Sequence, residues 1–383
     1  MAARWSMLIP GLLVVALVAM FLTMRPFSGL TTEVPPVEDL TFESVTLDEA
    51  GIQATLRASG SEPVRIAQVQ IDGAYRQFAL SSGNGVERLN RVRLDIPYPW
   101  VAGEAHTITV VTASGLTFEH VIEVALAGTP LSAAGALQLV MIGLFVGFVP
   151  ILVGYGFMPG LRSFGSAGLD FALALTMALL LFLLLDTWGE AMEFAGRASG
   201  ALNATLAVWI VAILTCLLLL SIGRRGGVAP RGAALAFFIA LGIGIHNLGE
   251  GIAIGASIAV GEVALASFLV MGFFLHNLSE GVAIAAPLKS GRGRLMALFL
   301  LALLAGAPAS LGTLAGAFAF TPFRAALAFA IGAGAIVQVL IEVGGLLMRR
   351  EDGAAPRFRS APAVGGFSAG MVVMYTTSLL ISG

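Results

Sequence analysis

The sequence predicts a polytopic α-helical membrane protein with a small all-β domain outside the membrane, and three observations support this fold class. Of the 383 residues, 57% are hydrophobic and 11% are charged, whereas an ordinary soluble domain has about 25% charged residues. Long apolar runs recur along most of the chain. One stretch, residues 31–128, departs from this composition because charged residues, Gly and Pro return there.

Nine apolar runs approach the length of about 20 residues that a helix needs to cross about 30 Å of hydrocarbon. They are residues 7–24, 131–153, 169–185, 202–222, 233–255, 264–287, 295–319, 325–348 and 364–381. A secretory signal is the alternative for the first run, but its length and the lack of a clear cleavage site favour a retained anchor. We therefore expect an anchor in residues 1–28, an extracytoplasmic domain in 29–128 and an eight-helix bundle in 129–383.

The stretch between the first two runs has the pattern of a β domain. Short segments alternate apolar with polar residues or are rich in β-branched residues; they are 41–47, 52–57, 64–71, 91–96, 106–111 and 117–124. Turn signals such as Asp72-Gly73 separate several of them. Their spacing predicts a small immunoglobulin-like β-sandwich. It lacks the usual disulfide, because the single cysteine, Cys216, lies in an apolar run.

The positions of arginine and lysine predict the orientation, because short cytoplasmic loops retain basic residues. With the amino terminus inside, twelve basic residues fall on the cytoplasmic side and three, Arg25, Arg197 and Arg324, on the other. The cytoplasmic set is Arg4, Arg162, Arg224, Arg225, Arg231, Lys289, Arg292, Arg294, Arg349, Arg350, Arg357 and Arg359. This places the β domain and the carboxyl terminus on the extracytoplasmic side of what we expect to be a bacterial or archaeal plasma membrane.

Two of the apolar runs contain ionisable side chains near their middle, where such groups usually face a cavity, a partner or an ion path. His246 and Glu250 lie in one run, and His276 and Glu280 in the next; each pair is spaced i, i+4 and so shares a helix face. Residues 246–256 and 276–286 are identical at 8 of 11 positions. If the two helices are antiparallel neighbours, the imidazoles face each other and the four groups form a column of ligands.

Imidazole nitrogen and carboxylate oxygen together suit Zn²⁺, Fe²⁺, Mn²⁺ or Co²⁺, and the lack of thiolates argues against Cu(I). Asn247 and Asn277 can add amide oxygens. The alternative is that each His only pairs with its own Glu, and two matched copies at the same depth disfavour it. The sequence therefore predicts a metal site formed by both helices.

The paired His-Asn-Leu-x-Glu-Gly runs resemble the fourth and fifth helices of the ZIP family of divalent metal-ion transporters. The resemblance covers the eight runs from residue 131 to 381. It implies a helical bundle with extracytoplasmic termini and a metal site, often binuclear, between those two helices. It also implies uptake toward the cytoplasm by sliding of one helix group past another.

Two positions depart from the family pattern. Members commonly have Pro before the motif glutamate, where this chain has Gly249 and Ser279. The sixth family helix often supplies a glutamate beside a proline, where this chain reads Pro308-Ala309-Ser310. The second departure argues against a second metal ion.

Other acidic residues are secondary candidates. Asp186 and Glu190, followed by Glu193, resemble the acidic outer end of the second family helix and can form a mouth that attracts cations; a solvated helix end is the alternative. Glu342, one turn from Gln338, resembles the glutamate region of the seventh family helix and is a candidate for an exit path. For the two histidines of the β domain, His106 and His120, we expect ordinary structural roles.

These observations predict a transporter rather than an enzyme, with the divalent ion as cargo and no required cofactor. An intramembrane metal-dependent hydrolase is one alternative, although zincins place Glu directly after the first His and Asn247 and Asn277 stand there. A metal-binding receptor that does not transport is another. The expected partners are divalent ions and the lipid bilayer; the net charge of −2 and the dispersed basic residues exclude nucleic acid. A homodimer is an open alternative, as is a partner for the β domain.

Overall fold

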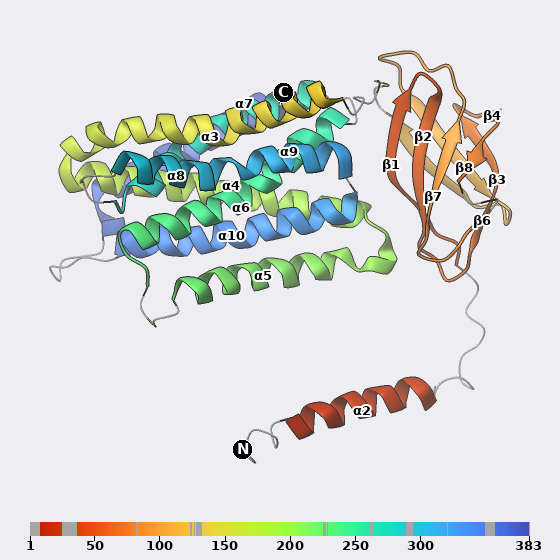
Figure 1. The fold of residues 1–383 in the computed structure, drawn as a ribbon, viewed down its shortest axis with the longest axis horizontal. Helices are drawn as coiled ribbons and strands as arrows, with labels where there is room; N and C mark the ends of the chain where they lie inside the picture. The colour runs from red at the N-terminus through yellow and green to blue at the C-terminus, as the bar shows by residue number, and fades with distance from the viewer. Residues whose placement is uncertain are drawn as a thin grey trace. The chain divides into compact units, whose positions relative to one another are not determined.

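The computed structural model describes residues 8–24, 37–81, 83, 85–122, 125, 127, 132–224, 227, 229–259, 263–288, 294–319, 321–348 and 357–382. Residues up to Val37 form one compact unit and Glu38–Gly383 a second. Most of the described residues are helical, and the strands are confined to the stretch between the first two helices (Figure 1).

Two antiparallel sheets make up the β domain, as the sequence predicts. One sheet has the order β1-β2-β7-β5; the other has the order β4-β3-β8-β9, with β6 paired to β3. The strands are β1 (Leu40–Asp48), β2 (Gly51–Ala58), β3 (Val64–Ile71), β4 (Ala74–Arg76), β5 (Ala79–Leu80), β6 (Gly85–Val86), β7 (Arg91–Ile96), β8 (His106–Thr112) and β9 (Thr117–Ile122). The six predicted strands correspond to β1, β2, β3, β7, β8 and β9, and the three additional strands have two or three residues each.

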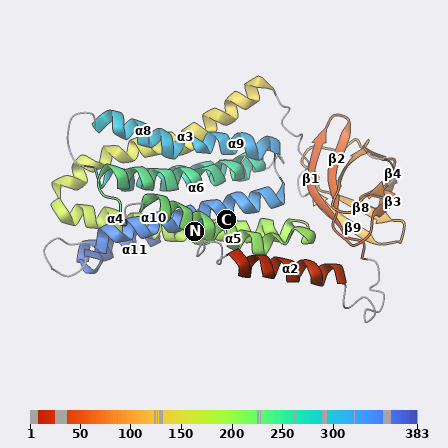
Figure 2. The same ribbon diagram turned by 60° about the horizontal axis from the view of Figure 1, so that its bottom comes forward.

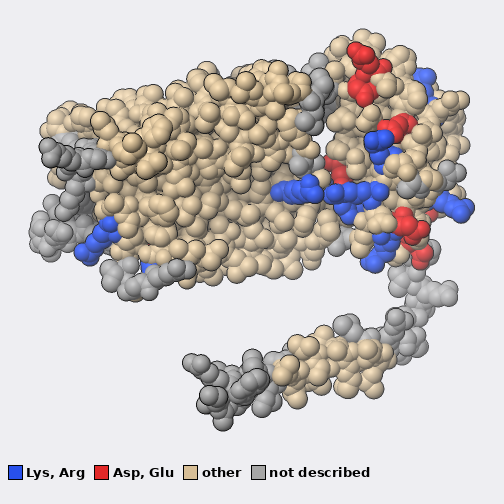
Figure 3. Space-filling model, viewed as in Figure 1, with Lys and Arg blue, Asp and Glu red and all other residues tan. Residues whose placement is uncertain are grey.

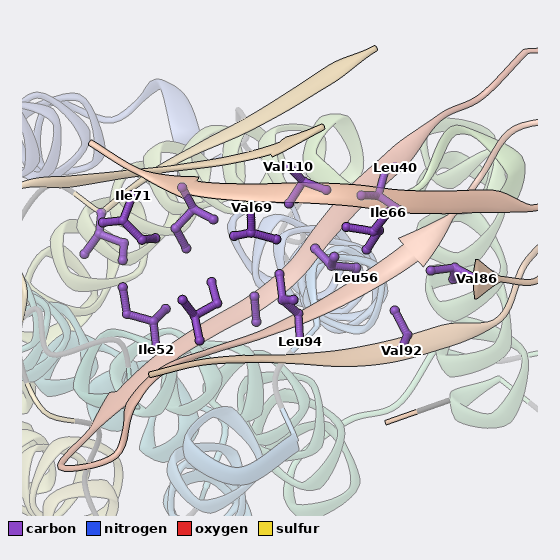
Figure 4. Packing of buried hydrophobic residues seen from close by; sticks show 14 of the residues in the cluster. Leu40, Ile52, Leu56, Ile66, Val69, Ile71, Val86, Val92, Leu94 and Val110 are labelled. Atoms are coloured by element: carbon purple, nitrogen blue, oxygen red, sulfur yellow. The ribbon is translucent and has the colours of Figure 1, made fainter. Parts of the chain in front are cut away.

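Alternating side chains of the two sheets meet in one apolar core (Figure 4). Ile52 and Leu56 of β2 and Leu94 of the neighbouring β7 belong to one sheet, Ile71 of β3 belongs to the other, and all four are fully buried in this core. The turn between β1 and β2 requires glycine, because Gly51 has φ +139° and a side chain there would overlap the Ile96 carbonyl.

Ten α-helices are described outside the β domain. They are α2 (Leu8–Met24), α3 (Ala133–Ser163), α4 (Gly165–Arg197), α5 (Ala204–Gly223), α6 (Ala233–Ala259), α7 (Val263–Ala285), α8 (Arg294–Gly306), α9 (Pro308–Ala319), α10 (Pro322–Met348) and α11 (Ala361–Ser382). Seven spans among the described residues are long and apolar enough to cross a membrane, with α8 and α9 together forming one of them. The chain is therefore an integral membrane protein.

The number of spans differs from the nine that the sequence predicts. The two helices outside the set are α2 and α11. At about 1.5 Å per residue, the 17 residues of α2 extend only about 25 Å. The described side chains of α11 end at Thr376, so this helix is not counted among the seven spans.

Two predicted runs have different boundaries in the structure. The run 295–319 is divided at Ala307 into α8 and α9, because Pro308 has no N–H to continue the helical hydrogen bonds. The run 169–185 continues as α4 to Arg197, so Asp186 and Glu190, which follow the run at helical spacing, belong to the same helix.

The helices after the β domain form two closely packed groups. In one group, α3, α6, α7, α8 and α9 approach through glycines: Gly147 of α3 meets Gly306 of α8, and Gly251 of α6 meets Gly312 of α9. In the other group, α4, α5, α10 and α11 pack together, and Gly334 of α10 lies against the Ala212 carbonyl of α5. Both ribbon views show α6 between α9 and α10, so α6 joins the two groups (Figure 2).

Charged side chains are distributed as a membrane protein requires. On the visible face they gather on the β domain, and the sides of the helices carry few of them (Figure 3). The helices instead expose apolar side chains such as Leu214 of α5 and Met271 of α7. An apolar outer surface of this kind suits hydrocarbon and not water.

Candidate metal centre

The two repeated motifs lie in the middle of consecutive helices. His246 and Glu250 belong to α6, and His276 and Glu280 belong to α7. All four side chains are buried, with exposed fractions between 1% and 6%. Since α6 and α7 are in contact, ionisable groups from two spans are brought together far from water.

The two imidazoles converge on one carboxylate oxygen of Glu250, so three of these four side chains meet. Glu250 Oε1 lies 2.9 Å from His246 Nε2 and 2.5 Å from His276 Nε2. The two imidazole rings have centroids 6.5 Å apart. The predicted meeting of the two histidines is therefore present, and Glu250 lies between them.

This arrangement has the chemistry of a cation site. In the structure both Nε2–H groups donate to Glu250 Oε1; a cation bound here would take the place of those protons, with the rings neutral and protonated on Nδ1. One donor atom from each of the three side chains lies within 4.8 Å of the others. Donor atoms around a tetrahedral ion with bonds of about 2.1 Å are about 3.4 Å apart, so a small rearrangement fits one ion.

Two asparagines fix the backbone around the centre. Asn277 Nδ2 donates to the Val146 carbonyl of α3 at 3.1 Å and to Glu250 Oε2 at 3.2 Å. Asn247 Nδ2 donates to the Ala305 carbonyl of α8 at 3.0 Å. Both Oδ1 atoms are buried and have no hydrogen-bond partner among the described residues. They are acceptors that an incoming cation can use.

Glu280 does not join the cluster, although it occupies the position in its motif that Glu250 occupies in the first. It is buried, and neither carboxylate oxygen has a hydrogen bond of normal geometry among the described residues. Its electrostatic neighbours are Glu250 and the side chain of Asn247. The two matched motifs thus contribute differently: the Glu250 carboxylate lies at the middle of the cluster, and the Glu280 carboxylate lies beside it.

The repeat extends to the way each motif helix packs. Gly251 of α6 lies against the Ala309 carbonyl of α9, and Gly281 of α7 lies against the Ile151 carbonyl of α3. Glycine is required at both positions, because a side chain would overlap the neighbouring backbone. The asparagine and the glycine of α6 therefore hold it against α8 and α9, whereas both residues of α7 hold it against α3.

The secondary candidates on α4 lie near the centre. Asp186 interacts electrostatically with His276, Glu250 and His246. Glu190, one turn later, interacts with Asp186 and with Glu193, and Glu193 is bound to Arg197 at 2.5 Å. The acidic residues thus extend along α4 from the centre toward the carboxyl end of that helix.

Glu342 of α10 has a partner that the sequence did not indicate. Its side chain is 4% exposed and accepts a hydrogen bond from Arg224 Nη2 at 3.2 Å. In the sequence Arg224 is one of several loop charges, and its pairing with Glu342 has no sign there because the two residues lie 118 positions apart. Thr187 was also missed: together with His246, it lies beside Gly332.

Both β-domain histidines have structural contacts. His106 Nδ1 lies 2.8 Å from Asp72 Oδ2, and its ring meets Tyr98 edge-on. His120 stacks on Phe42 with centroids 5.2 Å apart. Neither belongs to the metal-ligand cluster found among the described residues.

The structure therefore describes an integral membrane protein whose buried His/Glu/His cluster is compatible with metal binding. Comparison with known proteins adds no family: no family model matches the chain, and no curated protein matches its sequence.

Proposed function

We propose that this protein transports divalent transition-metal ions of the Zn²⁺, Fe²⁺ or Mn²⁺ type across the membrane, and that it is related to the ZIP transporters. The observation that carries the proposal is the convergence of His246, His276 and Glu250. His246 is the 14th of 27 residues in α6, and His276 is the 14th of 23 in α7. An ion bound at this depth can reach both sides of the bilayer only if the helices change conformation or leave a path between them.

The ligand set supports transport better than permanent storage. A structural metal site is usually closed by four strong ligands. Here two neutral imidazoles and one carboxylate meet, and amide oxygens of Asn247 and Asn277 are the further donors. Conduction requires binding that is favourable enough to admit an ion and weak enough to release it.

The helix packing supports movement of one helix group against the other. Glycine contacts between backbones hold each group together internally. Between α6 and α10, the atoms nearest to the Cβ position of Gly242 belong to the side chains of Val339 and Gln338, and the Ala335 carbonyl lies farther away. In this proposal α2 is a separate anchor, the remaining spans form the eight-helix bundle, and ions move toward the cytoplasm, with the β domain outside.

Flux into proteoliposomes tests the proposal. Purified protein is reconstituted, and uptake of Zn²⁺, Fe²⁺ and Mn²⁺ is followed with an enclosed indicator dye. We expect uptake of at least one ion, and we expect His276→Ala and Glu250→Ala to abolish it while the protein still inserts. His120→Ala is the matched control, because it removes a histidine of the β domain. Equal uptake by the wild type and both site variants would reject the proposal.

A further inference from the structure

A buried carboxylate and a partly exposed guanidinium form an ion pair where α5 and α10 lie side by side. The Glu342 side chain is 4% exposed and that of Arg224 is 40% exposed. Arg224 follows the last residue of α5, and its backbone N–H donates to Leu220. The arginine therefore reaches from the water-exposed end of a helix to a carboxylate inside the bundle.

Contacts along α10 connect this pair to the metal centre. Gly332 lies beside His246 of the centre, and six residues later Gln338 lies beside Gly242 of α6. Glu342 follows Gln338 by one helical turn. Between the centre and the ion pair, α10 thus carries two polar side chains, with Gln338 against α6 and Glu342 paired to the arginine that follows α5.

Gln338 has an unused acceptor on this line. Its side chain is 1% exposed, and its Oε1 atom has no hydrogen-bond partner among the described residues. A methyl group at Gly242 would lie 2.7 Å from Oε1 and 2.5 Å from Val339 Cγ2, so the glycine provides the space that the amide occupies. A buried carbonyl without a donor is costly, and a passing cation is a ligand that it can accept.

We propose that Arg224 is a gate residue: paired with Glu342, its guanidinium closes the route that leads from the His/Glu centre past Gln338. This inference rests on the proposed transport function and specifies how one end of the route is regulated. Glu342 and Gln338 supply oxygen atoms to a divalent ion that leaves the centre, and Arg224 takes the place of that ion when the route is closed.

Charge and burial explain why this pair can act as a gate. The fixed positive charge of Arg224 repels a divalent cation. A buried carboxylate left alone is unfavourable, so Arg224 stays in place until a metal ion can replace it as the partner of Glu342. Because Arg224 already reaches solvent, it can withdraw without losing hydration. The exchange keeps Glu342 paired throughout and so prevents a continuously open leak.

The test uses adducts of opposite charge at position 224. In a Cys216→Ala background, Arg224→Cys is reconstituted, and uptake of Zn²⁺ and Mn²⁺ is measured before and after reaction with methanethiosulfonates. One reagent adds a trimethylammonium group and the other a sulfonate. We expect Arg224→Cys to raise uptake about tenfold, a modest effect for a charge on a cation path. The positive adduct should return it toward the wild-type rate, and the negative adduct should not.

Matched controls separate the gate from transport itself. Arg231→Cys in the same background places the adducts at another exposed arginine, and neither reagent should alter its uptake. Because each variant is compared before and after labelling, misfolding cannot produce the charge dependence. If the wild type transports but uptake by Arg224→Cys is the same with both adducts, the gate is rejected and the transport function stands. If only Arg224→Cys transports, the gate is supported; if neither transports, both proposals fail.

Discussion

Glu250 Oε1 lies 2.5 Å from His276 Nε2 and 2.9 Å from His246 Nε2, so a single carboxylate oxygen joins the two motif helices. Glu280 occupies the matching position of the second motif and makes no such contact among the described residues. The near-identical repeat therefore produces an asymmetric centre. Because of this asymmetry, substitutions of the two glutamates should have different effects on metal binding.

The first prediction compares Glu250→Gln with Glu280→Gln. Glu250→Gln keeps the shape of the side chain but removes the carboxylate between the rings, so we expect metal affinity to fall at least about 100-fold, the upper end of what loss of an outer-shell partner costs. Glu280→Gln should lower it less. Titration calorimetry with Zn²⁺ and Mn²⁺ in detergent measures both. Equal losses would show that the centre is symmetric when metal is bound.

The second prediction concerns the two asparagines. Asn277→Ala and Asn247→Ala each remove the donor to a buried carbonyl, Val146 and Ala305 respectively, and each should cost about 1–3 kcal/mol of stability. Only Asn277 also donates to Glu250. We therefore expect similar losses of thermal stability in detergent without metal and a larger loss of metal affinity for Asn277→Ala. Similar affinities in the two variants would contradict this role.

Much of the fold can be predicted from the sequence, because length and apolar composition determine which segments can be buried in a bilayer. The six long strands follow from their alternation. The apolar run 169–185 covers only part of α4, because the helix continues through Asp186 and Glu190 to Arg197. The break between α8 and α9 is indicated only by Pro308, which stands in an otherwise apolar run.

The ligand residues can also be predicted, since His and Glu at i, i+4 in apolar helices are rare and expensive. Their partners cannot. Asn277 and Asn247 bind backbone carbonyls of α3 and α8. Pro150 leaves the Val146 carbonyl without its helical donor, but the sequence does not indicate which distant side chain takes that place. Nor does the repeat indicate which glutamate is central, because the two motifs differ in neighbouring residues and not in the ligands themselves.

The third prediction is a pH dependence in the β domain. Partial burial alone would raise the pKa of Asp72, but hydrogen bonds from the Thr107 N–H and from His106 lower this pKa below its ordinary value of 3.8. Because the pKa is lower in the folded chain, the stability that Asp72 contributes is complete above this ordinary value and is lost as the pH falls through the folded value.

Hydrogen–deuterium exchange of the β8 peptide in the intact protein, corrected for the intrinsic effect of pH, measures this dependence. Protection should fall as the pH drops below about 4, and Asp72→Asn should flatten that part of the profile. Asp95→Asn is the control, since its carboxylate binds the exposed Arg93 side chain, and it should preserve the profile. An unchanged slope in Asp72→Asn would assign the pH dependence to other groups.

The fourth prediction tests the packing that holds the centre together. Gly281→Ala places a methyl group against the Ile151 carbonyl and 3.1 Å from Gly154 Cα, so α7 must move away from α3. We expect a stability loss of about 1–3 kcal/mol, typical of overpacking, measured by thermal unfolding in detergent. Metal affinity should fall as well, because His276 moves with α7.

Gly345→Ala is the matched control for this change. Gly345 lies on α10, and no atom outside its own helical surroundings lies within 4 Å of the added methyl group. Alanine favours a helix over glycine by up to about 1 kcal/mol, so this variant should be as stable as the wild type or more so. If Gly281→Ala behaved like Gly345→Ala, close contact of α7 with α3 could not be what positions His276 beside Glu250.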